Sequence, residues 1–371
     1  MNFMRPLFIL LLMISSTGLA ADTRPTVTLE GKKAELVVDL GGGSISEFRL
    51  KPNGVNPLEW DSWSFSPHPG EEPPITPRSM GHFLCLDRWG SASEAERAHG
   101  MNQHGEATQV WWAVSHEMTS NAGKMNLRLR ADLPVAGLHV ERSIFMHESS
   151  TVAVVEEQVT NTNKIGRIYN MVQHPATGGP FLDAATIVDT NATRGFMQGG
   201  SMPNPEDPEV QWPIALREDG TEVDIRFLKD PDHSPNVVSF IVEEEYGWVT
   251  ATSPGSGLLI GYIWRASDYP WVNIWRHVMD GKPFARGLEF GTTGLHKPGH
   301  DLVAKGSIFD QPLYRYIDAD ETQSFKYAMF LMEVPEGFAG VKNVIYKDSI
   351  IHISEAGTGG RQIKIEAYSL F

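Results

Sequence analysis

An alternation of apolar and polar residues with period two runs through much of the chain and limits the folds that it can adopt. It is clearest at residues 125–130, Met-Asn-Leu-Arg-Leu-Arg, and further strand-like stretches cover residues 138–142, 152–159 and 258–264. This period places successive side chains on opposite faces of a β-strand. No stretch between residues 21 and 330 has the pattern of a long amphipathic helix. The sequence therefore predicts an all-β chain of antiparallel strands.

The organisation of these strands favours one domain. The 35 glycines and 24 prolines supply many turns, and neither a low-complexity linker nor an internal repeat divides the chain. We expect a single sandwich of two antiparallel sheets over residues 21–371. Residues 51–80 lack periodicity and predict a long surface excursion, placed over a site. Residues 335–346 predict one short helix.

The first twenty residues have the pattern of a cleaved signal peptide. Arg5 supplies positive charge, residues 6–14 are apolar, and residues 18–20 end in the small residues that a signal peptidase requires. The apolar stretch is too short to span a bilayer, which needs about 20 residues. We expect residues 1–20 to be removed on export to the periplasm or the outside of the cell. No membrane contact is expected after cleavage.

Charge argues against a nucleic-acid partner. The chain carries 31 Lys and Arg against 46 Asp and Glu, a formal net charge of −15 at pH 7. No Lys/Arg cluster is present to neutralise a phosphate backbone. The three glycines at 41–43 indicate a tight turn rather than a phosphate loop, since no suitably spaced lysine follows.

The sequence also predicts no metal site. Cys85 is the only cysteine, so no internal disulfide can form and no cysteine pair is present to bind zinc. Several histidines lie within one part of the chain, but their spacing fits no compact zinc motif: His82, His99, His104 and His116.

Three segments carry chemically useful side chains against this β background. Residues 101–112 combine an imidazole, a carboxylate and two tryptophans. Residues 170–182 place His174 at the end of an apolar strand, just before a glycine-rich turn. Residues 286–293 place the carboxylate of Glu289 between two apolar residues. Strand ends that open onto loops are where sheets commonly display functional groups.

These side chains also have purely structural interpretations. His104 can be satisfied by a nearby carbonyl, and His174 can cap its own loop. Glu289 faces away from Leu288 and Phe290, so it is a surface residue if those two enter the core. If Glu289 instead faces a cleft between the sheets, burial raises its pKa towards that of a general base.

Together the three segments resemble the galactose mutarotase-like superfamily, which contains the aldose 1-epimerases. The resemblance covers roughly residues 25–335 and depends on three short motifs in a fixed order. They are His-Gly-Glu-Ala at 104–107 followed by Trp111, His174-Pro175 followed by Gly-Pro-Phe-Leu at 179–182, and Gly-Leu-Glu-Phe-Gly at 287–291. The resemblance implies a β-supersandwich of two large antiparallel sheets with a sugar cleft across one of them.

The resemblance also implies catalytic roles and no cofactor. It makes His104 the residue that binds and polarises the sugar, His174 the general acid at the ring oxygen, and Glu289 the base at the anomeric hydroxyl. Ring opening requires one group to give a proton while another removes one, and an imidazole with a pKa near 6.5 can do either at neutral pH.

Five further residues are predicted to bind the sugar: Arg88, Glu106, Trp111, Trp275 and Arg286. Arg88 is the candidate for an arginine that precedes the first histidine in the family, and Arg286 could serve an anionic sugar. The chain departs from the family at residues 176–177, Ala-Thr, where an aromatic residue is usual. The family's hydroxyl-binding aspartate has three unranked candidates: Asp230, Asp232 and Asp268.

The function that these residues predict is an exported mutarotase or isomerase acting on a sugar by general acid/base catalysis. Two alternatives stay open on the same fold. One is a carbohydrate-binding protein without turnover, and the other is a polysaccharide lyase or hydrolase. In each case the expected partner is a small-molecule sugar or an oligosaccharide.

Overall fold

The computed structural model describes residues 23–358 and 360–367, so the predicted signal peptide lies outside the described residues. Strands predominate in this part of the chain. Its α-helices are short: α1 (Glu94–Ala98) and α2 (Gly299–Lys305). No helix within the described ranges has the length and apolar character needed to cross a membrane. The all-β prediction is confirmed.

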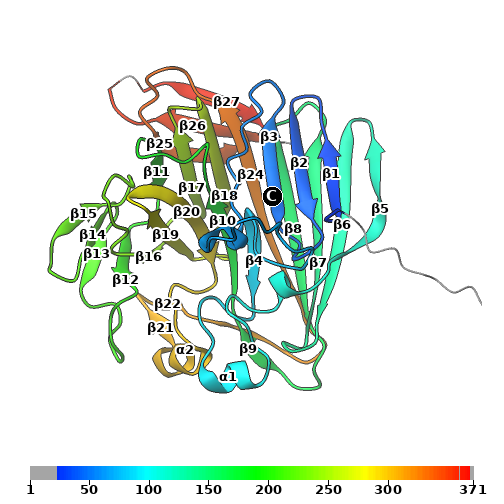
Figure 1. Ribbon diagram of the computed structural model, residues 1–371, viewed down its shortest axis with the longest axis vertical. Helices are drawn as coiled ribbons and strands as arrows, with labels where there is room; N and C mark the ends of the chain where they lie inside the picture. Colours follow the sequence, from blue (N-terminus) through cyan, green and yellow to red (C-terminus); the bar gives the residue numbers. More distant parts are fainter. Residues whose placement is uncertain (1–22, 359, 368–371) are drawn as a thin grey trace, which may run out of the picture.

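Two large antiparallel sheets form the body of the molecule (Figure 1). In spatial order, the ten-stranded sheet consists of β1 (Thr26–Glu30), β2 (Ala34–Asp39), β3 (Ile45–Leu50), β4 (His82–Leu86), β10 (Met171–Thr177), β20 (Lys282–Gly291), β19 (Trp271–Met279), β16 (Val237–Ile241), β12 (Arg194–Met197) and β13 (Glu209–Gln211). The eight-stranded sheet consists of β11 (Ile187–Thr190), β17 (Tyr246–Ser253), β18 (Leu258–Arg265), β24 (Thr322–Glu333), β8 (Val152–Asn161), β7 (Leu138–His147), β6 (Lys124–Leu133) and β5 (Ala113–Asn121). This is the predicted sandwich of two large sheets.

Smaller elements decorate this body. Figure 1 shows α1 and α2 at one end of the sandwich and the sheet of β25, β26 and β27 at the other. The minor strands are β9 (Arg167–Tyr169), β14 (Ile214–Leu216), β15 (Glu222–Asp224), β21 (Ser307–Ile308), β22 (Gln311–Pro312), β23 (Arg315–Ile317), β25 (Val341–Lys347), β26 (Ile350–Glu355) and β27 (Gln362–Glu366), and the 3₁₀-helices are η1 (Ser62–Phe65) and η2 (Ala107–Gln109).

The helix predicted within residues 335–346 is wrong, because β25 occupies much of that segment and pairs with β26. Val341 and Val344 are buried in an apolar cluster that covers the outer face of the eight-stranded sheet. Their spacing of three suits a helix, but a register shift between Val341 and Asn343 lets a strand bury both side chains. Tertiary packing therefore overrides the local spacing.

The core between the two sheets decides which side chains face outwards. On β20, Leu288 and Phe290 enter this core, where Phe290 stacks on Trp264 of β18 with ring centroids 4.1 Å apart. Because side chains alternate along a strand, Glu289 points to the opposite, outer face. His174 of β10 has the same orientation. The chemically useful side chains thus lie on the outside of the ten-stranded sheet.

A buried polar network supports β10 from the core side. Arg142 donates to Glu157 Oε1 at 2.7 Å, and Gln173 Nε2 donates to Glu157 Oε2 at 2.5 Å and to the hydroxyl of Tyr269 at 3.1 Å. His82 Nε2 lies 3.1 Å from Gln173 Oε1. Burial, and then the charge of Arg142, lower the pKa of His82 to about 3, so its ring is neutral at pH 7. The network fixes Gln173, the residue that precedes His174.

Candidate active site

A cleft of about 560 Å³ opens on the outer face of the ten-stranded sheet. Four adjacent strands each place a side chain along it: Phe83 from β4, His174 from β10, Glu289 from β20 and Trp275 from β19. Residues from the 51–80 excursion form part of its wall, as do residues from the first sequence motif. The cleft therefore lies outside one sheet, and the interpretation that placed it between the sheets is wrong. Core packing of Leu288 and Phe290 turns Glu289 outwards, while the loops above keep it buried.

The centre of the cleft is a contact between His174 and Glu289. The antiparallel register of β10 and β20 sets Gln173 opposite Phe290 and Ala176 opposite Gly287, which brings the two functional side chains to neighbouring positions. His174 Nε2 lies 3.2 Å from Glu289 Oε1. Their exposures are only 4% and 1%. At this distance a proton can pass between the two groups.

Burial controls the protonation of this pair. It raises the pKa of Glu289 well above its usual value and lowers the pKa of His174, in the second case with a smaller contribution from His104. Both shifts favour uncharged groups, namely a protonated carboxyl beside a neutral imidazole. Moving that one proton across the contact gives a carboxylate beside an imidazolium. The pair can therefore act as acid and base without changing its net charge.

Trp89 holds the second oxygen of the carboxyl. Its indole Nε1 donates to Glu289 Oε2 at 2.6 Å, and this hydrogen bond lowers the pKa of Glu289 against the larger effect of burial. The Trp89 ring is 1% exposed and packs edge-on against His296, with centroids 4.7 Å apart. The sequence did not single out Trp89 as a site residue.

His104 places a third functional group beside the pair. Its ring centroid lies 5.3 Å from that of His174. The backbone N–H of Gly90 donates to His104 Nδ1 at 3.2 Å, so the proton of the neutral ring is on Nε2, where the side-chain amide of Gln103, 3.3 Å away, accepts it once its oxygen is turned to the ring. Burial, and then His296, lower the pKa of His104 to about 3. His104 is therefore a neutral hydrogen-bond donor at pH 7.

The sequence analysis missed several polar side chains of the cleft, among them Asn236 and His296. His296 lies in the loop after β20, where Gln198 Oε1 accepts a hydrogen bond from its backbone N–H at 2.8 Å. Burial lowers the pKa of His296 to about 4. Neither of these two belongs to a recognisable local motif, so only the tertiary structure brings them to the site.

Of the five residues predicted to bind the sugar, Trp275 lines the cleft and four others do not. Arg88 instead forms an ion pair with Glu96 of α1. Arg286 is buried and donates to the backbone carbonyl of Ile225. We correct the expected position of both arginines, because partners distant in sequence hold them elsewhere.

The two remaining residues come from the first motif. Glu106 accepts hydrogen bonds from the backbone N–H groups of Val135 and Ala136, each at 3.0 Å. Trp111 is 47% exposed and forms an isolated bridge with Gly41. Of these residues of the first motif, therefore, only His104 lies in the cleft, whereas Glu106 and Trp111 hold the loop in place.

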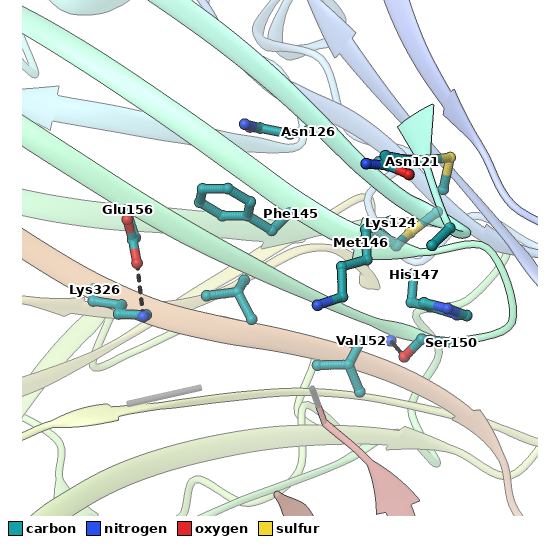
Figure 2. A pocket seen from close by; sticks show the side chains of 13 residues that line it. Asn121, Lys124, Asn126, Phe145, Met146, His147, Ser150, Val152, Glu156 and Lys326 are labelled. Atoms are coloured by element: carbon teal, nitrogen blue, oxygen red, sulfur yellow. Dashed lines mark hydrogen bonds and ion pairs between the residues drawn. The ribbon is translucent and has the colours of Figure 1, made fainter. Parts of the chain in front are cut away.

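A second hollow, of about 600 Å³, lies on the outer face of the eight-stranded sheet (Figure 2). Phe145 and Asn126 line it, and its carboxylate, Glu156, forms an ion pair with Lys326 at 2.7 Å. Since this carboxylate is neutralised by an ammonium group rather than set against an imidazole, the hollow lacks the acid–base arrangement of the cleft. Within residues 23–358 and 360–367, no group of three or more His, Cys, Asp or Glu side chains is arranged to hold a metal ion.

Comparison with known proteins identifies the fold. No protein-family model and no curated protein sequence matches the chain. A galactose mutarotase related enzyme from Lactobacillus acidophilus is 12% identical, with a TM-score of 0.59 over 84% of this chain and 100% of that one. Galactose mutarotase-like proteins from Lactobacillus casei and Clostridium acetobutylicum are 14% and 12% identical, with TM-scores of 0.57 and 0.58. They are matched over 83% and 84% of this chain and 100% and 96% of their own. The chain therefore has the galactose mutarotase-like fold, as its three motifs predicted.

Proposed function

We propose that the protein is an aldose 1-epimerase-like isomerase that interconverts the anomers of a sugar. The observation that carries this proposal is the contact between His174 Nε2 and Glu289 Oε1 at 3.2 Å, with His104 beside it in a cleft. A carboxyl and an imidazole that share one proton are what opening and closing a sugar ring requires. The fold supports the proposal because its structural neighbours include proteins described as mutarotase-like.

In the proposed reaction the anomeric carbon lies over this pair. Glu289 takes the proton of the anomeric hydroxyl while His174 gives a proton to the ring oxygen, the bond between C1 and the ring oxygen breaks, and an aldehyde forms. After rotation about the C1–C2 bond, the ring hydroxyl returns its proton to His174 and attacks C1. Glu289 then protonates the new anomeric oxygen. His104, through its Nε2–H, hydrogen-bonds a sugar oxygen and stabilises the charge that develops there.

Burial and the hydrogen bond from Trp89 have opposite effects on the pKa of Glu289. Burial favours the protonated form of Glu289, whereas the indole N–H of Trp89 favours the carboxylate. Burial is the larger effect, so the carboxyl rests in its protonated form, and the hydrogen bond from Trp89 lowers the cost of the carboxylate form that must accept the proton.

Export is part of the same proposal. Residues 1–20 have the charge and apolar pattern of a signal peptide. The protein would then meet sugars in the periplasm or outside the cell. N-terminal sequencing of the protein recovered from the periplasm tests this, with Ala21 expected as the first residue.

Polarimetry of freshly dissolved aldoses tests the activity. We expect the protein to accelerate mutarotation, and Glu289→Gln and His174→Asn each to reduce the rate by about 10² to 10⁴-fold, the usual contribution of a positioned acid or base. Glu141→Gln is the matched control, because this exposed carboxylate lies on β7, away from the cleft. Full activity of the Glu289→Gln variant would disprove the proposal. Sugar binding by the parent protein without any acceleration would favour the carbohydrate-binding alternative.

A further inference from the structure

The cleft continues beyond the acid–base pair towards its mouth. Glu289 and His174 are 1% and 4% exposed, whereas Phe65, which lines the same cavity, is 39% exposed. The volume of about 560 Å³ lies within the range of about 300 to 1,000 Å³ that small-molecule sites span. One pyranose ring placed over the pair leaves the outer part of this cavity unfilled. The cleft therefore has room for a second sugar unit.

Three aromatic side chains, which we call the aromatic shelf, form the outer part of the cleft: Phe65, Trp275 and His277. Phe65 lies 6.0 Å from Trp275 and 5.3 Å from His277 between ring centroids, and Trp275 lies 5.9 Å from His277. Trp275 also lies 5.7 Å from His174, so the shelf adjoins the reacting pair directly. Partly exposed rings of this kind suit the apolar C–H faces of a sugar.

The segment that presents Phe65 is held in place. Arg78 donates two hydrogen bonds of 2.7 Å to the two carboxylate oxygens of Asp61. Asp61 in turn caps η1, which ends at Phe65, by accepting from the N–H of Trp63 at 2.9 Å. A ring that is ordered before binding loses little entropy when a ligand stacks on it.

A polar atom beside the shelf is available to a ligand. Asn236 donates its Nδ2 to the carbonyl of Arg276 at 2.5 Å, which leaves its Oδ1 to accept from a hydroxyl. The cation of the wall, Arg78, is occupied by Asp61 and by the carbonyl of Pro74. These groups suit an uncharged, hydroxyl-rich ligand.

We propose that the substrates of this site are neutral, (1→4)-linked oligosaccharides with a free reducing end, rather than single sugars. This inference rests on the isomerase function proposed above. In a pyranose, C4 lies across the ring from C1. When C1 is over His174 and Glu289, a unit linked through C4 is directed towards the mouth, where it stacks on the aromatic shelf.

Mutarotation rates of matched substrates test the inference. With the purified protein, kcat/KM for cellobiose, maltose and lactose should exceed kcat/KM for glucose and galactose. Phe65→Ala should lower kcat/KM for the disaccharides by about tenfold, mainly through KM, and change that for glucose by less than about twofold. Tyr316→Ala is the control, because this tyrosine is 58% exposed and lies on β23, away from the cleft. It should change neither rate.

The outcomes separate the shelf from the isomerase function. Two results would refute the role of the shelf without refuting the isomerase function. One is acceleration of glucose mutarotation without acceleration of disaccharide mutarotation. The other is an equal loss of kcat/KM for glucose and disaccharides in the Phe65→Ala variant. If no aldose of either length is accelerated, the isomerase proposal fails, and tryptophan fluorescence decides about the shelf. Tighter binding of cellobiose than of glucose, weakened by Phe65→Ala, would then support it. Equal binding of the two sugars would refute it.

Discussion

Replacing Trp89 by phenylalanine should shift the pH dependence of catalysis by a predictable amount. The indole N–H of Trp89 donates to Glu289 Oε2 at 2.6 Å, and phenylalanine keeps a buried ring without that donor. A hydrogen bond to a charged group contributes about 1.5 to 3 kcal/mol. Since one pKa unit corresponds to about 1.4 kcal/mol, the loss should raise the pKa of Glu289 by about one to two units. The sign follows because the lost donor stabilised only the carboxylate.

The measurement is the pH profile of kcat/KM for the best-accelerated sugar. Because the resting pair carries its one proton on Glu289, loss of that proton forms the basic limb of the profile, so in the Trp89→Phe variant this limb should move to higher pH by about one to two units. The control is Trp112→Phe, because Trp112 is equally buried and donates to the carbonyl of Ala107 at 2.9 Å, away from the cleft. The Trp112→Phe variant should be less stable to unfolding, but this limb of its pH profile should stay at the same pH. An unmoved limb in the Trp89→Phe variant would refute the assignment of Glu289 as the base.

Three further predictions concern the frame around the site. Gly105 has a φ of +80°, and a Cβ there would lie 2.1 Å from the carbonyl oxygen of Leu86. Gly105→Ala should therefore lower the thermal unfolding midpoint and the activity. An unchanged midpoint would contradict this loop geometry. Glu157→Gln leaves Arg142 buried beside a neutral group and should cost about 3 to 5 kcal/mol in denaturant unfolding, whereas a loss below about 1 kcal/mol would mean that water reaches the pair. Because the pKa of His82 is about 3 in the fold and near 6.5 when unfolded, the unfolded chain binds the extra proton as pH falls. The contribution of His82 to stability should decrease by up to about 1.4 kcal/mol per pH unit between pH 6.5 and about 3, and His82→Gln should remove that component.

Local periodicity was sufficient to predict the strands and to place Glu289 opposite to Leu288 and Phe290, but not which of these faces enters the core or what lies above Glu289. The period of two correctly predicted that Glu289 points to the opposite face of the strand from Leu288 and Phe290. Whether its face is open to water depends on the loops that cross it, such as residues 60–65 and 103–109. Those contacts join segments about 200 positions apart, as the bond from Trp89 to Glu289 shows. A single sequence carries no record of such pairs.

Charged residues were the least predictable part of the site. Arg88 and Arg286 have the type expected of sugar-binding groups, yet one pairs with Glu96 and the other with a backbone carbonyl. Burying a charge is costly unless it is paired, so these partners decide where each side chain goes. Asp230, a candidate for the hydroxyl-binding aspartate, likewise pairs with Arg217 at 2.9 Å. The cleft instead contains Asn236, whose amide needs no counter-charge.

The position of His174 depends on the ladder to β4, where it pairs with Phe83, and on side-chain contacts more than on the ladder to β20. Paired positions between β10 and β20 run to Gln173 and resume at Ala176, an interruption that matches the missing N–H of Pro175. The ladder to β20 is therefore interrupted next to the imidazole of His174. What replaces it is the buried network on Gln173 from the core side and the contact with Glu289 from the cleft side. Disturbing the core network should consequently weaken catalysis at temperatures where the protein remains folded, because Gln173 and His174 share one short stretch of backbone.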